Sequence, residues 1–510
     1  MLSKIYASTV LGIDAFVIPI EIDIQNGMPS MQVVGLPSAT VKEARDRVRS
    51  AITNSGHKFP LKRITINLAP ADIKKEGALF DLPIAIGLLT ASLETNNIGL
   101  EQTIIVGELA LNGDVRPIHG ALSIADTAKK NNFNRLILPK ENIKEAAVIN
   151  GLQCFGVSTL NEALEILHDD THLAYSLEIE NLFVNKTSNY NCDLSEIKGQ
   201  YNVKRGIEIA CAGHHNVVLI GPPGCGKTMI AKRIPTILPH LILEEAIEAT
   251  KIYSVSGQLE ANDGLVLSRP FRAPHHTASD VSIVGGGSNP KPGEISLAHN
   301  GVLFLDEFPE FHKQVLQVLR QPMEDRKVTI ARSERTATFP ANFMLVASMN
   351  PCPCGYFNHP EKQCKCSKTA VTKYMQKISG PIMDRIDIQL EVSKIDYDDM
   401  ISKSEAEENS DTVRTRIINA RKFQLERFAK TETKSNAEMT RRQTETFCEL
   451  TDSCHKILRI AVDKFGMSAR AFDKILKVAR TIADLEERQN IEEGDIMEAL
   501  QYRALDKIYG

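Results

Sequence analysis

The segment Gly221–Thr228, which reads GPPGCGKT, constrains the fold more than any other feature of the chain. It has the pattern G-x-x-x-x-G-K-T and follows an apolar run, Val217–Ile220. Glycines at these positions let backbone N–H groups point at phosphate oxygens, and the next helix adds the positive end of its dipole. We therefore predict a strand, a phosphate-binding loop and a helix rather than a ligand-free turn. The residues expected to hold a nucleotide are Gly221, Pro222, Pro223, Gly224, Cys225, Gly226, Lys227 and Thr228.

The last two residues of this loop carry its chemistry. Lys227 is expected to reach the β- and γ-phosphates, and the Thr228 hydroxyl is expected to bind Mg²⁺. About 80 residues later a second apolar run ends in Asp306 and Glu307. An aspartate at the end of a strand beside a phosphate loop can hold Mg²⁺, and the following acid can act as general base on the attacking water. The alternative, two solvated acids after a strand, is disfavoured by the spacing.

Three further polar residues sit where a nucleotide could be sensed. The apolar run FMLVASMN ends at Asn350, which suits contact with a γ-phosphate. Arg385, in SGPIMDRIDIQLEV, lies between a helix and a strand, as an arginine that reaches a neighbouring subunit's nucleotide would. A surface salt bridge with Asp384 or Asp387 is the alternative. Arg470, at the start of a helical stretch, is a candidate second sensor with a similar alternative.

Four cysteines lie shortly after Asn350, in the segment NPCPCGYFNHPEKQCKC. Cys352, Cys354, Cys364 and Cys366 form C-x-C, nine intervening residues and C-x-C. Four thiolates satisfy tetrahedral Zn²⁺, and such a closed site is structural. Reduced cysteines in an ordered loop are the alternative, and His359 is a substitute ligand.

Composition limits the partners and the compartment. The chain has 510 residues, 43% of them apolar, and a net charge of −4, which argues against a uniformly basic nucleic-acid binder but not against local basic surfaces. No apolar run approaches the roughly 20 residues of a membrane span. The first residues read as strands rather than as a signal peptide. We therefore expect a cytoplasmic protein without membrane contact, in which cysteines stay reduced.

The chain divides into regions of different periodicity. Residues 1–171 alternate strand and helix patterns, including a strand at Arg63–Ala69, a buried helix in LFDLPIAIGLLTAS and a hairpin at Asn112–Gly113. Residues 172–200 are polar and read as a linker. Residues 201–394 alternate strands and helices again, and residues 395–510 are mostly helical. The expected class is α/β.

The strings SRPFRAPHHTASDVSIVGGG, PGEISLAHNGVLFLDEFPEF and SGPIMDRID resemble the AAA+ ATPases of the magnesium-chelatase-like group. Over nearly all its length, the chain resembles the ComM (YifB) competence-protein family. The resemblance implies an AAA+ core with a C-terminal helical lid, ATP and Mg²⁺, a hexameric ring, and a DNA helicase that promotes branch migration in natural transformation. It assigns Gly221–Thr228 as Walker A, Asp306 and Glu307 as Walker B, Asn350 as sensor 1, Arg385 as the arginine finger and Arg470 as sensor 2.

The N-terminal strings KKEGALFDLPIAIGLL and VGELALNGDVRPIHGALSIA resemble the Lon protease catalytic domain, an α+β domain of ribosomal S5 type. Lon-type sites use a Ser–Lys dyad. The alignment places Leu79 at the serine position and Leu122 at the lysine position, while Ser123 and Lys129–Lys130 do not match. Leucine can neither attack a carbonyl nor take a proton, so we expect no protease activity. This domain is then expected to form a ring tier that binds DNA or stabilises the hexamer.

Two insertions leave alternatives open. Residues 258–292 include side chains that line a pore or brace it: Arg269, Arg272, His275 and His276. The segment RKVTIARSERTATF reads as a hairpin whose tip, near Arg332–Arg335, either grips a DNA backbone or is a solvated turn. The basic stretch VRTRIINARKFQLERFAK fits DNA contact or a solvated lid face. The leading function is a DNA motor, and the alternative is a magnesium-chelatase-type ATPase that remodels a protein partner.

Overall fold

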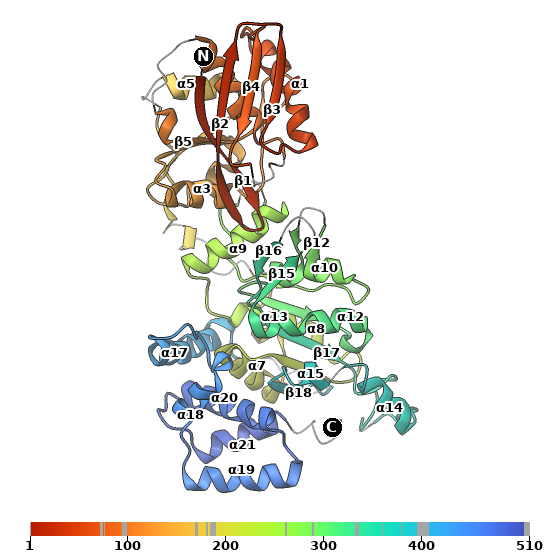
Figure 1. Ribbon diagram of the computed structural model, residues 1–510. Coiled ribbons are helices and arrows are strands. Elements are labelled where there is room, and N and C mark those ends of the chain that lie inside the picture. Colours follow the sequence, from red (N-terminus) through yellow and green to blue (C-terminus); the bar gives the residue numbers. More distant parts are fainter. Residues whose placement is uncertain are drawn as a thin grey trace.

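The computed structural model describes residues 2–71, 75, 77–93, 99–168, 172–179, 182–183, 190–260, 263–287, 290–331, 336–359, 361–378, 380–394 and 407–503. Three bodies follow one another along the molecule: an N-terminal sheet with its helices, a central α/β core and a C-terminal helical group (Figure 1). Within these ranges, no helix combines the length and the apolar character that a membrane crossing requires.

The N-terminal body is built on a seven-stranded mixed sheet of order β3-β4-β2-β1-β5-β8-β9. The long strands β1 and β2 form an antiparallel hairpin, and alternate residues of β2 are buried because successive side chains point to opposite faces. The strands are β1 Leu2–Leu11, β2 Asp14–Gln25, β3 Ser30–Val34, β4 Arg63–Leu68, β5 Thr103–Ile105, β8 Arg135–Pro139 and β9 Gln153–Val157.

Helices complete this body, and the expected local elements are confirmed. The predicted buried helix is α2 (Asp81–Leu93), and the predicted hairpin is the pair β6 (Glu108–Leu109) and β7 (Val115–Arg116). Of its two expected turn residues, Gly113 has a positive φ, 91°, and Asn112 does not. The other helices are α1 Ala39–Asn54, α3 Ala121–Lys130, α4 Ile143–Ala146 and α5 Leu160–His168.

The central core is a five-stranded parallel sheet of order β11-β14-β17-β10-β18. Strands β10, β14 and β17 are buried throughout, as expected where helices cover both faces of a parallel sheet. The strands are β10 Val217–Ile220, β11 Phe271–Arg272, β14 Val302–Leu305, β17 Met344–Met349 and β18 Ile388–Glu391. The helices are α7 Tyr201–Gly213, α8 Lys227–Ile237, α9 Leu243–Ser256, α10 Asp280–Val284, α11 Glu294–Leu297, α12 Lys313–Val318, α13 Arg320–Asp325, α14 Lys368–Met375 and α15 Gly380–Met383.

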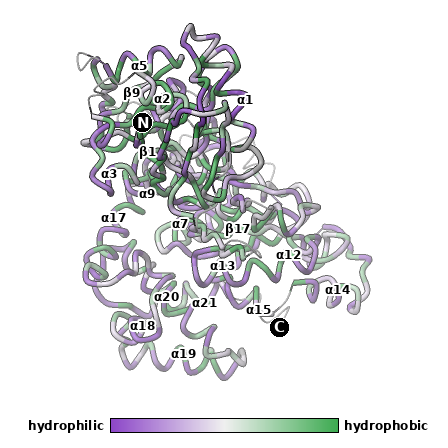
Figure 2. Tube along the Cα trace, turned by 45° about the horizontal axis from the view of Figure 1, so that its top comes forward, coloured by the Kyte–Doolittle hydropathy of each residue, from purple (hydrophilic) through white to green (hydrophobic). Residues whose placement is uncertain are grey.

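The C-terminal group is helical, as predicted, and packs on α7 through α17 and α20. Helix α20 buries one apolar side that includes Ile475, Ala479 and Ile482, whereas the outer traces of this group in Figure 2 are largely hydrophilic. The helices are α17 Ser410–Phe428, α18 Arg441–Phe447, α19 Asp452–Phe465, α20 Ala469–Leu485 and α21 Glu493–Gln501.

Helix α9 of the core is docked against the N-terminal body. Lys251 Nζ lies 2.5 Å from Asp126 of α3, and the Ser254 hydroxyl accepts a hydrogen bond of 2.8 Å from the Gly120 N–H. The turn between β1 and β2 also reaches the core, where Ile13 packs against buried residues. These three contacts join the two bodies directly.

Candidate functional site

The phosphate loop and the predicted acidic and polar residues leave the core sheet at one edge. Ile220 pairs with Met349, and Leu305 pairs with Ala347, in parallel register. The carboxyl ends of β10, β14 and β17 therefore meet, which is where ligands bind in open parallel sheets.

The loop itself has the geometry expected from its glycines. Gly224 and Gly226 have φ values of 80° and 90°, which other residues rarely adopt. The Lys227 ammonium donates to the Gly221 carbonyl at 2.7 Å and to Asn350 Oδ1 at 3.1 Å. Burial lowers the pKa of Lys227. The structure thus brings Lys227 and Asn350 together.

Two oxygens suited to Mg²⁺ face each other beside this lysine. Thr228 Oγ1 donates to Asp306 Oδ2 at 2.8 Å, and hydroxyl and carboxylate oxygens are the ligands that Mg²⁺ accepts. Ser348 Oγ donates to the other oxygen of Asp306. Sequence reasoning missed Ser348, although a polar residue inside the strand FMLVASMN, two positions before Asn350, was a usable signal because such residues share a face.

Glu307 contacts a histidine of the first insertion. Its φ is 53°, and its carboxylate lies 3.1 Å from His276 Nδ1. His276 in turn packs on His275, with ring centroids 4.1 Å apart. From the sequence, His276 was expected either to line a pore or to brace it. Its contact with the candidate general base was not predicted.

The two arginines of the same insertion are braces. Arg272 forms a bidentate ion pair with Glu294 at 2.6 and 2.7 Å. Arg269 donates to the Asn300 carbonyl at 2.7 Å and to Glu245 at 3.0 Å. Both guanidinium groups are therefore satisfied inside the core.

Arg385 and Arg470 both form ion pairs within the chain. Arg385 pairs with Glu324, not with either aspartate considered from the sequence, and also donates to the Pro381 carbonyl. Arg470, on α20, pairs with Asp384 at 3.1 Å. Through this ion pair the helical group contacts the segment that carries Arg385.

Several arginines of the basic helix α17 pair with groups of the protein itself, whereas Lys422 and Leu425 are exposed. Arg416 pairs with Glu208 and Glu408, and Arg427 pairs with Asp484. Arg421 donates to the Cys211 carbonyl. These contacts attach α17 to its neighbours α7 and α20.

The predicted hairpin of the second insertion is present as strands β15 (Lys327–Ala331) and β16 (Thr336–Pro340). Its tip, Arg332–Arg335, lies outside the described residues. Gly12, in the β1–β2 turn, approaches Ala337 of this hairpin.

The four predicted cysteines converge. Sγ–Sγ separations are 3.4 Å for Cys352–Cys354, 3.7 Å for Cys352–Cys364 and 3.6 Å for Cys354–Cys364. All four sulfurs, including that of Cys366, lie within 4.8 Å of one another. All four cysteines are free thiols. This is the donor set of a tetrahedral thiolate site.

The positions of the Ser–Lys dyad are packed rather than reactive. Leu122 is fully buried against Leu241, Ala246 and Leu265 of the core. Leu79 is half-buried and packs against the core of the N-terminal body. The nearby polar groups are also engaged: Ser123 donates to the Ile13 carbonyl, Lys129 to the Gly151 carbonyl, and Lys130 pairs with Asp126.

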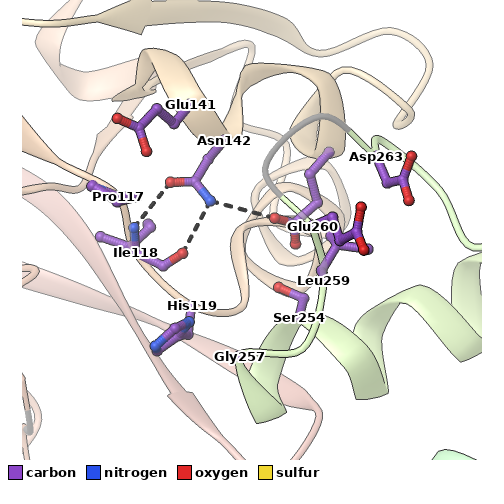
Figure 3. A pocket seen from close by; sticks show the side chains of 11 residues that line it. Pro117, Ile118, His119, Glu141, Asn142, Ser254, Gly257, Leu259, Glu260 and Asp263 are labelled. Atoms are coloured by element: carbon purple, nitrogen blue, oxygen red, sulfur yellow. Dashed lines mark hydrogen bonds between the residues drawn. The ribbon is translucent and has the colours of Figure 1, made fainter.

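A cavity of about 210 Å³ lies beside these residues, between the N-terminal body and the end of α9 (Figure 3). The Asn142 side-chain amide makes two hydrogen bonds with the backbone of Ile118: its Oδ1 accepts from the N–H at 2.9 Å, and its Nδ2 donates to the carbonyl at 3.0 Å. Glu145 accepts from the Leu122 N–H at 2.7 Å, and burial raises the pKa of Glu145. Ser254 completes the wall, so polar side chains from both bodies line the cavity.

Family comparisons agree with this geometry. Family models described as magnesium chelatase, subunit ChlI, match residues 193–400; subunit ChlI of Mg-chelatase matches residues 20–142; and the ChlI C-terminal region matches residues 407–503. The parallel core, its phosphate loop and these matches define a magnesium-chelatase-like AAA+ protein, a class that implies ATP and Mg²⁺.

Whole-chain relatives narrow the assignment. The chain is 42% identical to competence protein ComM of Haemophilus influenzae over 508 residues, which cover 99% of this chain and 98% of that protein. It is 43% identical to YifB of Escherichia coli K12, with the same coverage. The chain therefore belongs to the ComM/YifB family. A partial similarity, 31% over 147 residues, links 26% of the chain to 25% of Lon protease 2 of Bacillus subtilis.

Proposed function

We propose that the protein is an ATP-driven DNA motor that migrates branches during the recombination of incoming DNA. The observation that carries the ATPase part is the convergence of Lys227, Thr228, Asp306 and Asn350 at the carboxyl edge of the core sheet. Relatedness to a competence protein over nearly the whole chain supports the DNA part.

In this proposal each group has one task. Lys227 neutralises the β- and γ-phosphates, and Asn350 contacts the γ-phosphate. Thr228 and Asp306 would hold Mg²⁺, which supplies charge neutralisation when bound. Glu307 accepts a proton from the attacking water.

The remaining assignments concern assembly. Six copies form a ring in which Arg385 reaches the neighbouring nucleotide and Arg470 senses it from the lid. In the described structure Arg385 pairs with Glu324 and Arg470 pairs with Asp384, both within one chain. When the ring closes, each arginine leaves its acid and binds phosphate instead. The proposed divisions are 1–171 for a Lon-like tier, 172–200 for a linker, 201–394 for the AAA+ core and 395–510 for the lid.

The proposed tier serves as scaffold or DNA surface, not as a protease. Packing of Leu122 against the core, and engagement of Ser123 and Lys129 by backbone carbonyls, support that reading. Cleavage of casein by the pure protein, abolished when Leu79 is substituted, would refute it.

The test is to trap the motor on DNA. With Glu307→Gln the hydrolytic step should stop after ATP binding, so ATP should cause stable binding to a fluorescent forked DNA. Affinity should fall steeply with salt, because phosphate contacts release counterions. Lys227→Ala, which should not bind ATP, is the matched control. Equal DNA affinity with and without ATP in Glu307→Gln refutes the proposal.

A chelatase-type remodeller is the second candidate, because the matching family models carry that description. In that case turnover should rise with a protein partner, and DNA should leave it unchanged.

A further inference from the structure

The cysteine segment lacks a hydrophobic core of its own. Between β17 and α14 the chain passes through residues 350–367 without a helix or strand among its described residues. Those that are buried are Pro351, Cys352 and Gly355. Loops of this length without their own secondary structure are uncommon, and small units with too little core are commonly stabilised by a metal.

The sulfur separations fit such a metal. Four sulfurs about 2.3 Å from Zn²⁺ in a tetrahedron lie about 3.8 Å from one another. The observed 3.4–3.7 Å is near that value and far above the ~2.05 Å of a disulfide. Backbone N–H groups of Tyr356 and Lys365 donate hydrogen bonds to the Cys354 sulfur.

The same segment touches the phosphate loop at two places. At its start, Asn350 accepts from Lys227 at 3.1 Å. Further along, Gly355 has a φ of 82°, and a Cβ there would lie 2.5 Å from Pro223 Cδ. The backbone of the cysteine segment therefore lies directly on the loop that is expected to hold the nucleotide.

We propose that the four cysteines bind a structural Zn²⁺ and that this metal holds the phosphate loop in its nucleotide-binding shape through Gly355 and Asn350. The coupling rests on the proposed ATPase function. Without the metal the segment loses its fixed shape and the loop loses its support, so MgATP affinity falls.

The first arm of the test measures metal in the full-length protein. Elemental analysis should find about one zinc per chain in the parent and in Cys192→Ser, a control cysteine outside the cluster. Cys364→Ser/Cys366→Ser should lose the zinc, and its Kd for MgATP should rise roughly tenfold or more. Absence of zinc from the parent, or iron in its place, overturns the proposal.

The second arm keeps all four cysteines, so it does not depend on the folding of the cysteine variant. Gly355→Ala should retain zinc but weaken MgATP binding roughly tenfold, because its Cβ meets Pro223 and its φ is unfavourable for alanine. Gly466→Ala, also at positive φ but with nothing within 4 Å, should bind MgATP as the parent does.

The outcomes separate the two claims. A parent that binds zinc but no nucleotide refutes the proposed ATPase. A parent that binds both, with unchanged affinity in Gly355→Ala and in the zinc-free variant, refutes the coupling.

Discussion

Two ion pairs on α20 allow stability and catalysis to be separated. Lys474 and Arg470 lie one helical turn apart and pair with Asp387 and Asp384 of the same core segment. The Lys474–Asp387 side chains are 12% and 13% exposed, whereas those of Arg470 and Asp384 are 69% and 41% exposed. We predict that Lys474→Met releases the lid from the core and that Arg470→Met does not.

The magnitude follows from burial. Removing one partner of a buried pair leaves an uncompensated charge and costs about 3–5 kcal/mol. Asp387 keeps contacts at 3.3 Å with His215 Nδ1 and with the Asn216 N–H, so the lower figure, about 3 kcal/mol, applies. That is roughly a hundredfold increase in lid opening. The exposed Arg470 pair contributes at most about 1 kcal/mol.

Native-state hydrogen exchange, read on peptides of α20 and α21, measures this opening directly. Lys474→Met should lose roughly a hundredfold in protection there while β17 is unchanged. Arg470→Met should keep its protection yet lose ATP turnover if it serves as the second sensor. Equal protection in both variants would show that the buried pair does not hold the lid.

Other expectations follow from named contacts. Leu122→Ala should weaken the packing of the N-terminal body on the core by about 2–5 kcal/mol. Hydrogen exchange in α3 and α9 should become faster, and no peptide cleavage should appear. Unchanged exchange contradicts the packing argument. His276→Ala should raise ATP turnover without DNA about fivefold, because a hydrogen bond of ~1 kcal/mol no longer holds Glu307 on the histidine. A lower turnover would mean that His276 assists the reaction. Burial opposes ionisation of Asp387, but Lys474 and His215 outweigh it and hold its pKa far below the usual range, so its contribution is complete above about pH 5 and is lost as pH falls below the ~3.9 of an unfolded aspartate. If the free energy of opening of α20, from exchange rates corrected for the intrinsic rate at each pH, is the same at pH 3.5 and pH 7, that assignment is contradicted.

The phosphate site was largely predictable because its signals are local. A glycine pattern after an apolar run fixes a strand, a loop and a helix, and parallel strands bring Asp306 and Asn350 to the same edge. The convergence of the four cysteines was also readable from spacing.

Partners supplied by distant segments were not predictable. Glu324 meets Arg385 across 61 residues, and nothing in either local pattern selects that pair. The same holds for His276 and Glu307. It also holds for α17, whose basic composition did not show that its arginines pair with acids on α7 and α20. Leu122 could be read as a lost lysine, but its role in the joint with the core required the fold.

The central claim is tested most directly by the steady-state ATP turnover of the full-length protein with and without a four-way DNA junction. Turnover should rise severalfold with the junction, and the effect should disappear as salt is raised, because the binding that drives it depends on phosphate contacts. Turnover that is the same with and without DNA at low salt would contradict the DNA-motor account.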